Sequence, residues 1–333
     1  MATDKLVEYV RGILDRDAVS ADTLPAARPA DAGLETVGPK TVGITPEHRE
    51  TLRKVEGGQP LTLQERAQLE AVVIPNGLRP AFDVTNDTFE ALPETWKEVN
   101  AHRLVLESMI KSIGRLNVTG HPALTFVGTA FVVAHDLLLT NRHVAEYFVD
   151  GVGATVQFKS GMSGTLDFKQ EVGSPVTLPL RIAAPILILD DWDAALLRVD
   201  PLPAGVTPLT LSASPPAAIE GRLAVVIGYP AMDPASDLIQ QIQIFRGVFD
   251  KKRLMPGRLM GGKTTTSYAR TVTALGHDCT TLGGNSGSAL IDVASKSVVG
   301  LHFAGDYLVA NYAVPSWELA SEAQITAAGV VFT

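Results

Sequence analysis

The spacing of apolar residues along the chain changes at about Ile113. Before this residue, apolar side chains recur at helical spacing, as in the stripe formed by Trp96, Val99, Leu106 and Ile110. After it, short apolar runs alternate with turns every ~8–12 residues, which is typical of β-barrels and β-sandwiches. The pattern therefore predicts a mainly β protein in which a helical N-terminal region precedes a β-domain.

Residues 1–111 are expected to form this helical extension. Residues 6–14 place apolar side chains on one helical face, whereas residues 19–44 are rich in alanine and proline without periodicity, so we expect a linker there. A second helix is expected over 45–58, and a capping box predicts a third over 62–73. No motif with a known chemistry occurs in this region.

The β-domain is expected to span residues 112–333. Its strands form one set within about 112–205 and another within about 217–315, each able to close into a barrel, and a C-terminal helix is expected after Pro315. The first set is predicted at 126–133, 137–140, 154–159, 165–169, 180–183 and 194–199. The second set is predicted at 223–228, 241–248, 267–273, 287–292, 297–303 and 312–314.

Composition narrows the range of functions. The formal net charge is −8 and charged residues make up 19% of the chain, which argues against binding to nucleic acid, because the phosphates would be repelled. The basic cluster Lys251, Lys252, Arg253 and Arg258 is interpreted as an exposed loop. The single cysteine, Cys279, cannot form an internal disulfide bond, which is typical of a reducing compartment or a bacterial protein.

Signals for targeting and for cofactors are missing from the sequence. The first ten residues include acidic side chains and no continuous apolar core, so no signal peptide is predicted. No run approaches the ~20 apolar residues of a membrane span, and we expect a soluble cytoplasmic protein without membrane partners. Since no zinc-binding helix motif, thiolate cluster, phosphate loop or dinucleotide fingerprint occurs, neither a metal ion nor a cofactor is expected.

A glycine-rich turn carries the first candidate for chemistry. Ser286 lies in the run GGNSGS, which is followed by an apolar strand. Glycines on both sides let the backbone bend sharply and leave the serine at the apex, and the amides of Gly284 and Ser286 can point the same way, as an oxyanion hole requires. The alternative interpretation is an ordinary turn serine in a glycine-rich hairpin.

Two upstream runs favour catalysis at this serine. The run LLLTNRHV leads from an apolar strand into a turn that carries His143, and the run WDAALLRV places Asp193 just before another strand. A serine hydroxyl becomes a good nucleophile when an imidazole takes its proton and a carboxylate orients the imidazole. Asp190 and Asp191 are close alternatives to Asp193, but they are interpreted as solvated loop acids.

These three runs resemble the motifs of the trypsin-like (chymotrypsin-fold) serine peptidases. LLLTNRHVA is similar to the histidine motif of that family, DAALLRV to its aspartate motif and GGNSGSAL to its serine motif. The resemblance covers residues 112–315. It implies two six-stranded antiparallel β-barrels packed face to face, with a catalytic triad of His143 and Asp193 from the first barrel and Ser286 from the second.

The serine motif is most similar to that of the bacterial glutamyl-endopeptidase branch. At the position of Asn285, the trypsin group has an aspartate that pairs with a newly cut N-terminal ammonium. Asparagine carries no charge, so that activation route is expected to be absent here.

The same resemblance implies a substrate site on the strand after the serine motif. Phe303, Ala304 and Gly305 would pair with an extended substrate and line its pocket. Thr281 and His302 match residues that receive an acidic side chain in the glutamyl branch. The alternative is that His302 is a hydrogen-bonded strand histidine, in which case a small or apolar preference is expected.

The expected function is therefore that of a serine endopeptidase that cleaves protein or peptide substrates through an acyl-enzyme. One alternative is a catalytically silent module that captures extended peptides. Another is a regulatory partner subunit, with the N-terminal helices as the docking surface for a regulatory protein.

Overall fold

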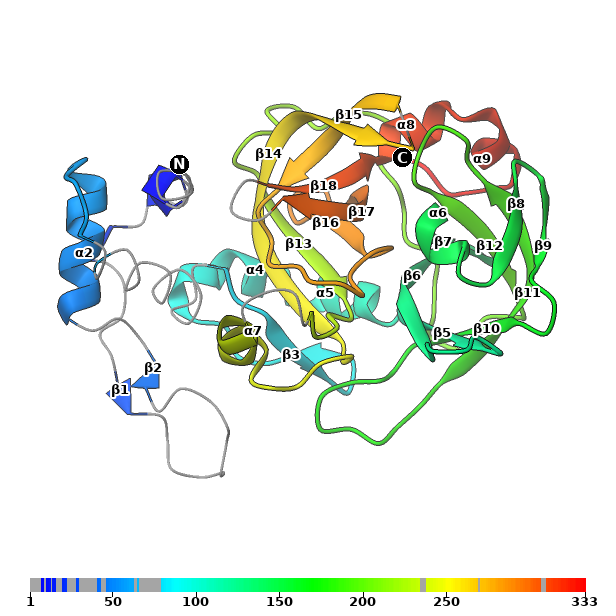
Figure 1. Ribbon diagram of the computed structural model, residues 1–333, viewed down its shortest axis with the longest axis horizontal. Coiled ribbons are helices and arrows are strands. Elements are labelled where there is room, and N and C mark those ends of the chain that lie inside the picture. The colour runs from blue at the N-terminus through cyan, green and yellow to red at the C-terminus, as the bar shows by residue number, and fades with distance from the viewer. Residues whose placement is uncertain are drawn as a thin grey trace.

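The chain is described here by a computed structural model that arranges two β-units side by side (Figure 1). No helix within the described residues is long and apolar enough to cross a membrane. The described residues are 79–233, 238–268, 270–306 and 310–333 and, earlier in the chain, 7–8, 10–12, 14–15, 20–22, 28–29, 41–42, 46–62 and 65.

The first unit is a closed, antiparallel, six-stranded barrel in the order β10-β11-β12-β7-β6-β5, as the sequence predicts for 112–205. The expected strand at 154–159 is not part of it: β9 (Thr155–Phe158) pairs only with β8 (Val149–Val152) in a separate hairpin. The barrel strands are β5 (Ile113–Thr119), β6 (Phe126–Ala134), β7 (Leu137–Thr140), β10 (Ser163–Asp167), β11 (Pro179–Ile188) and β12 (Ala195–Val199). The missed strand β5 completes the barrel because its alternate side chains are buried, whereas those of β9 are exposed or half-buried.

The second unit is an eight-stranded antiparallel sheet in the order β13-β16-β17-β18-β15-β14-β3-β4, in which β13 also pairs with β14. The expected six-stranded second barrel is not confirmed, because β3 and β4 extend this sheet beyond β14. Its strands are β3 (Phe82–Thr85), β4 (Thr88–Phe89), β13 (Leu223–Gly228), β14 (Arg253–Ser267), β15 (Arg270–His277), β16 (Ala289–Asp292), β17 (Ser297–Asp306) and β18 (Ala310–Pro315). The long strand β14 is the cause, since its first part pairs with both β13 and β3 while its second part pairs with β15.

Two interpretations of the region before and within β14 are wrong. The expected strand at 241–248 is the helix α7 (Leu238–Phe245), in which the buried Gln241 and Phe245 lie four residues apart on one face. The basic cluster is not an exposed loop: Arg253, the first residue of β14, and Lys252 directly before it are both fully buried. Lys252 Nζ donates to the carbonyls of Ile110 and Phe168, which replace water around its charge.

The region expected as a helical extension is mixed. Helix α2 (Pro46–Glu56) confirms the second expected helix, and the two-residue strands β1 (Arg28–Pro29) and β2 (Thr41–Val42) pair within the expected linker. The backbone N–H groups of Thr62 and Glu65 donate to each other's side chains, as a capping box requires. Most of the linker, part of the first helix and nearly all of the helix expected over 62–73 lie outside the described residues.

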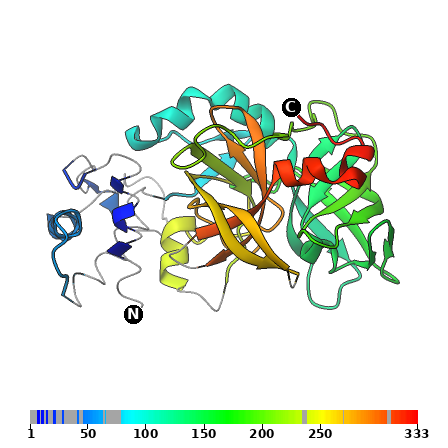
Figure 2. The same cartoon turned by 90° about the horizontal axis from the view of Figure 1, so that it is seen from above.

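Residues 79–111 contribute to the β-units directly. Strands β3 and β4 extend the second sheet, and the expected helix is divided into η1 (Glu94–Trp96), α4 (Lys97–Ala101) and α5 (Arg103–Ile110). All four residues of the predicted stripe are buried, so the apolar face was correct even though the helix is broken. The expected C-terminal helix is present as α8 (Ser316–Ser321) and α9 (Ala323–Ala327), which Figure 2 shows beside both units.

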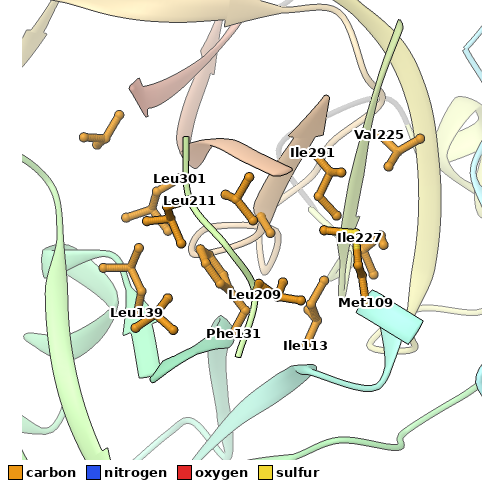
Figure 3. Close-up of a cluster of buried hydrophobic side chains, with 14 of the residues drawn as sticks. Met109, Ile113, Phe131, Leu139, Leu209, Leu211, Val225, Ile227, Ile291 and Leu301 are labelled. Carbon is orange, nitrogen blue, oxygen red and sulfur yellow. The ribbon is translucent and has the colours of Figure 1, made fainter. Parts of the chain in front are cut away.

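A shared apolar core joins the two units and fixes where their strand ends meet. Figure 3 shows Phe131 and Leu139 of the first barrel close to Ile227 and Leu301 of the second sheet. Leu209, in the proline-rich stretch between the units, lies among them, and its N–H donates to the carbonyl of Val132. Since this interface excludes water, the two units present their strand ends to each other in a defined arrangement.

Candidate active site

His143 and Asp193 form a two-point hydrogen-bonded pair. His143 lies in the short helix α6 (Arg142–Ala145) after β7, and its Nδ1 is 2.6 Å from Asp193 Oδ2. The other carboxylate oxygen accepts the backbone N–H of His143 at 3.0 Å, and Asn141 Nδ2 donates to the Asp193 carbonyl at 2.8 Å. The Asp193 side chain is 6% exposed and that of His143 is 37% exposed. This geometry holds the proton on Nδ1 and leaves Nε2 as the basic nitrogen.

The two neighbouring aspartates face other partners. Asp191 pairs with Arg270 on β15, and Asp190 is exposed, with its carbonyl accepting from Arg142. Asp193 is therefore the carboxylate of this loop that contacts His143, as the sequence predicts.

The turn around Ser286 depends on the glycines at both sides. Gly284 and Gly287 have φ values of +81° and +88°, in the region that disfavours side chains. A Cβ atom at Gly284 would lie 2.4 Å from the Tyr229 carbonyl oxygen, and one at Gly287 would lie 1.9 Å from that of Thr129. The loop can therefore pack this closely only with glycine at both positions.

Thr129 of β6 attaches this turn to the first barrel. Its N–H donates to the Ser286 carbonyl at 2.9 Å, and its Oγ1 donates to the Gly284 carbonyl at 2.8 Å. The adjacent Gly128 separates the Ser286 carbonyl from Val144, the residue after His143. The serine turn and the histidine helix are thus brought together across the interface. Within the described residues, no hydrogen bond joins the Ser286 side chain to His143.

Two amides of the serine turn are left free. The N–H groups of Asn285, Gly287 and Ser288 donate to carbonyls of Leu282, His302 and Asn285, respectively. Those of Gly284 and Ser286 donate to no protein acceptor in the described part of the chain. The two amides predicted for the oxyanion hole are therefore available to a ligand.

The side chain of Asn285 is fully buried at the turn. Its Oδ1 and Nδ2 and the Oγ of Ser288 have no hydrogen-bond partner among the described residues. Gly228 of β13 makes room for both, since a Cβ atom there would lie 2.6 Å from Asn285 Oδ1 and 2.0 Å from Ser288 Oγ.

His302, on β17, is buried and contacts a second histidine. Its Nδ1 is 3.1 Å from Nε2 of His277, the last residue of β15, and its exposed fraction is 3%. Burial, together with His277 and His143, holds the pKa of His302 well below its ordinary value, and burial lowers the pKa of His277 to about 4. Both imidazoles are therefore neutral at pH 7.

The other predicted substrate-binding residues follow along β17 and before the serine turn. Phe303 lies at a register shift between β17 and β18 and is buried, Ala304 is half-buried, and Gly305 is exposed. Thr281 Oγ1 donates to Asn311 Oδ1 at 2.9 Å. Sequence reasoning did not identify Asn311 or His277, because neither lies in a motif and each reaches the site only through strand pairing.

A third group that the sequence did not indicate lies beside His143. Tyr268, at the tip of the β14–β15 hairpin, donates its hydroxyl to Glu146 at 3.1 Å. The Arg142 guanidinium lies 3.8 Å from the centre of the Tyr268 ring and donates to Glu146 at 2.7 Å. Burial, with the charges of Asp193 and Glu146, raises the pKa of Tyr268, so its hydroxyl keeps its proton.

The family model for the trypsin-like peptidase domain matches residues 128–301. The match covers more than half of the chain and includes His143, Asp193 and Ser286. The chain belongs to the trypsin-like peptidase family. As a member of that family, it is 30% identical over 304 residues to a probable serine protease of Lysobacter enzymogenes, covering 81% of this chain and 78% of that protein.

Two solved structures are among those to which the chain is similar. The active form of the Rv3671c protease from M. tuberculosis has a TM-score of 0.48 and 20% identity, over 75% of this chain and 93% of that chain. Deg5 has a TM-score of 0.46 and 19% identity, over 68% of this chain and 92% of that chain.

Among the described residues, no three His, Cys, Asp or Glu side chains are placed to share a metal ion.

Proposed function

We propose that this family member is a serine endopeptidase in which Ser286 is the nucleophile, His143 the general base and Asp193 the group that orients His143. The observation that carries the proposal is the two-point contact of Asp193 with His143, because it holds the imidazole in the tautomer that can accept a proton at Nε2. Catalytic hydrogen bonds are often long without substrate, so we expect the Ser286–His143 bond to form when a peptide binds.

The proposed reaction is acyl transfer. Ser286 Oγ attacks the scissile carbonyl carbon while His143 Nε2 takes the hydroxyl proton. The carbonyl electrons move to oxygen, where the free amides of Gly284 and Ser286 stabilise the negative charge. The C–N bond then breaks, and His143 gives the proton to the leaving amine. A water molecule, deprotonated by His143, releases the acyl group and restores Ser286.

Protein or peptide substrates are the proposed partners. The backbone of Phe303 to Gly305 would pair with an extended substrate, and Thr281 and His302 would face the side chain before the scissile bond. The preference for Glu or Asp at that position stays a prediction from the sequence, as does the small or apolar alternative. Docking of a regulatory protein on the N-terminal helices likewise stays a prediction.

A fluorophosphonate probe tests the proposed nucleophile, since it reacts covalently only with an activated serine. We expect labelling and peptide cleavage by the full chain, and loss of both in Ser286→Ala, which deletes one oxygen. His143→Ala should lose several orders of magnitude in cleavage rate, because triad residues act together. An unlabelled but folded full chain would instead support the silent peptide-binding module.

A further inference from the structure

The hydrogen bonds around Thr281 fix its hydroxyl as a donor to Asn311. Asn311 Nδ2 donates to the Cys279 carbonyl at 2.7 Å, which turns Oδ1 of the same amide toward Thr281. The Thr281 hydroxyl donates its single proton to this oxygen at 2.9 Å. A hydroxyl has one proton and two lone pairs, so Thr281 can only accept a hydrogen bond from a further group.

The hydrogen bond between His277 and His302 decides which nitrogen of His302 carries its proton. The Nδ1 of His277 is buried and has no partner within the described chain. If His302 donated to His277 Nε2, His277 would carry its own proton on Nδ1 as an unpaired N–H. If His277 donates instead, only a lone pair is left unpaired. Unpaired buried N–H groups are rarer than unpaired acceptors, so we assign the proton of the contact to His277.

His302 then accepts at Nδ1 and carries its own proton on Nε2. The imidazole therefore offers an N–H donor on the side away from His277. Because burial and the neighbouring His277 and His143 oppose a second proton on this ring, the donor is neutral. Two groups of opposite polarity, an N–H on His302 and a lone pair on Thr281, are left for a substrate.

We propose that Thr281 and His302 select a neutral carboxamide side chain, Gln or Asn, immediately before the scissile bond, with Asn311 and His277 as positioning residues. This inference rests on the proposed function and on both residues facing that side chain. A carboxamide oxygen accepts from His302 Nε2–H, and its NH₂ donates to Thr281 Oγ1. A carboxylate has no proton for Thr281 and meets its lone pairs, and an apolar side chain leaves both groups unpaired.

A matched set of peptides that differ only in this residue tests the inference on the full chain. With Gln, Glu or Leu at the position, we expect kcat/KM for Gln to exceed both others by about ten- to hundredfold. A preference for Glu or Leu would overturn the carboxamide assignment while leaving the serine peptidase intact. Failure of the proposed function would differ, since Ser286 would then also resist fluorophosphonate labelling, and both proposals would fall.

Variants of Thr281 and Asn311 distinguish two roles for these residues: selecting the substrate side chain, or only supporting the strand. Thr281→Val removes the acceptor at nearly constant shape and should lower kcat/KM for Gln about tenfold while changing Glu little, whereas Thr281→Ser should retain the Gln:Glu ratio. Asn311→Leu frees the Thr281 proton for a carboxylate and should shift the ratio toward Glu. Equal losses for both peptides, with normal fluorophosphonate labelling, would show that these residues only support the strand and would overturn the inference.

Discussion

Asn285 and Ser288 lie on either side of the Ser286–Gly287 pair with buried polar atoms that have no partner among the described residues. A buried amide without a partner costs stability, so the close packing of the glycine turn must hold it in place. The charge matters more than the shape at this position, since an aspartate of nearly equal size would put a negative charge where both side-chain polar atoms of Asn285 have no hydrogen-bond partner among the described residues.

We therefore expect Asn285→Asp to lower the free energy of unfolding by about 3 kcal/mol, the typical cost of a buried unpaired charge. Urea unfolding followed by fluorescence measures this change. Ser288→Ala is the control, because it removes a hydroxyl without a partner and should change stability by less than about 1 kcal/mol. An Asn285→Asp variant of normal stability whose activity vanished when its amino terminus was blocked would contradict this, and would indicate an N-terminal ion pair.

At the scale of elements, the β14–β15 hairpin crosses from the second unit to the first. Tyr268 contacts Arg142 and Glu146 on either side of His143, and Arg270 pairs with Asp191 close to Asp193. These contacts join one hairpin to both loops that carry the histidine–aspartate pair. The hairpin therefore helps to hold that pair in the geometry that the proposed base requires.

Tyr268→Phe tests this role of the hairpin, since it removes one hydrogen bond to a carboxylate. We expect a loss of about 1.5–3 kcal/mol in stability and a slower fluorophosphonate reaction at Ser286. Tyr147→Phe, at an exposed tyrosine in the same region, is the matched control and should change stability by less than about 0.5 kcal/mol. If both variants behaved alike, the Tyr268 hydroxyl would have no role in holding α6.

At the scale of the whole molecule, residues 79–111 tie the two units together. Arg79 and Asp278 form a buried ion pair at 2.6 Å, and the fully buried Glu171 accepts the backbone N–H groups of Asn86 and Asp87. Lys252 depends on a carbonyl of α5 in the same way. Removing this segment would take the Arg79 cation from Asp278, two N–H donors from Glu171 and one carbonyl from Lys252. Weakening the pairing of buried charges is far more costly than losing exposed ion pairs.

Two truncated chains distinguish an integral segment from an accessory one. A chain of residues 79–333 retains all of these contacts, and we expect it to unfold in one cooperative transition and to react with the fluorophosphonate. A chain of residues 112–333 lacks the Arg79 guanidinium that pairs with Asp278 and the Ile110 carbonyl that accepts from Lys252, and we expect it to lack a cooperative transition. Equal folding and labelling of both chains would show that residues 79–111 are an accessory, as the sequence alone suggests.

Local sequence patterns were enough to predict the features that depend only on residue type and on order along the chain. The triad candidates stand at strand ends in three motifs, and the structure places His143 against Asp193. The apolar stripe of residues 96–110 is buried as expected. The family assignment also follows from the chain order of these motifs.

The remaining features depend on contacts between residues far apart in the sequence. His277 contacts His302, and Asn311 contacts Thr281, through pairing of β15, β17 and β18. The second sheet gains β3 and β4 only because β14 is long enough to pair on both sides. By residue type, Lys252 and Arg253 indicate a solvated loop, since a lone charge is costly to bury. A carbonyl of α5 accepts from Lys252, a carbonyl of α7 accepts from Arg253, and the Asp83 carboxylate pairs with Arg253. These partners come together only in the folded chain.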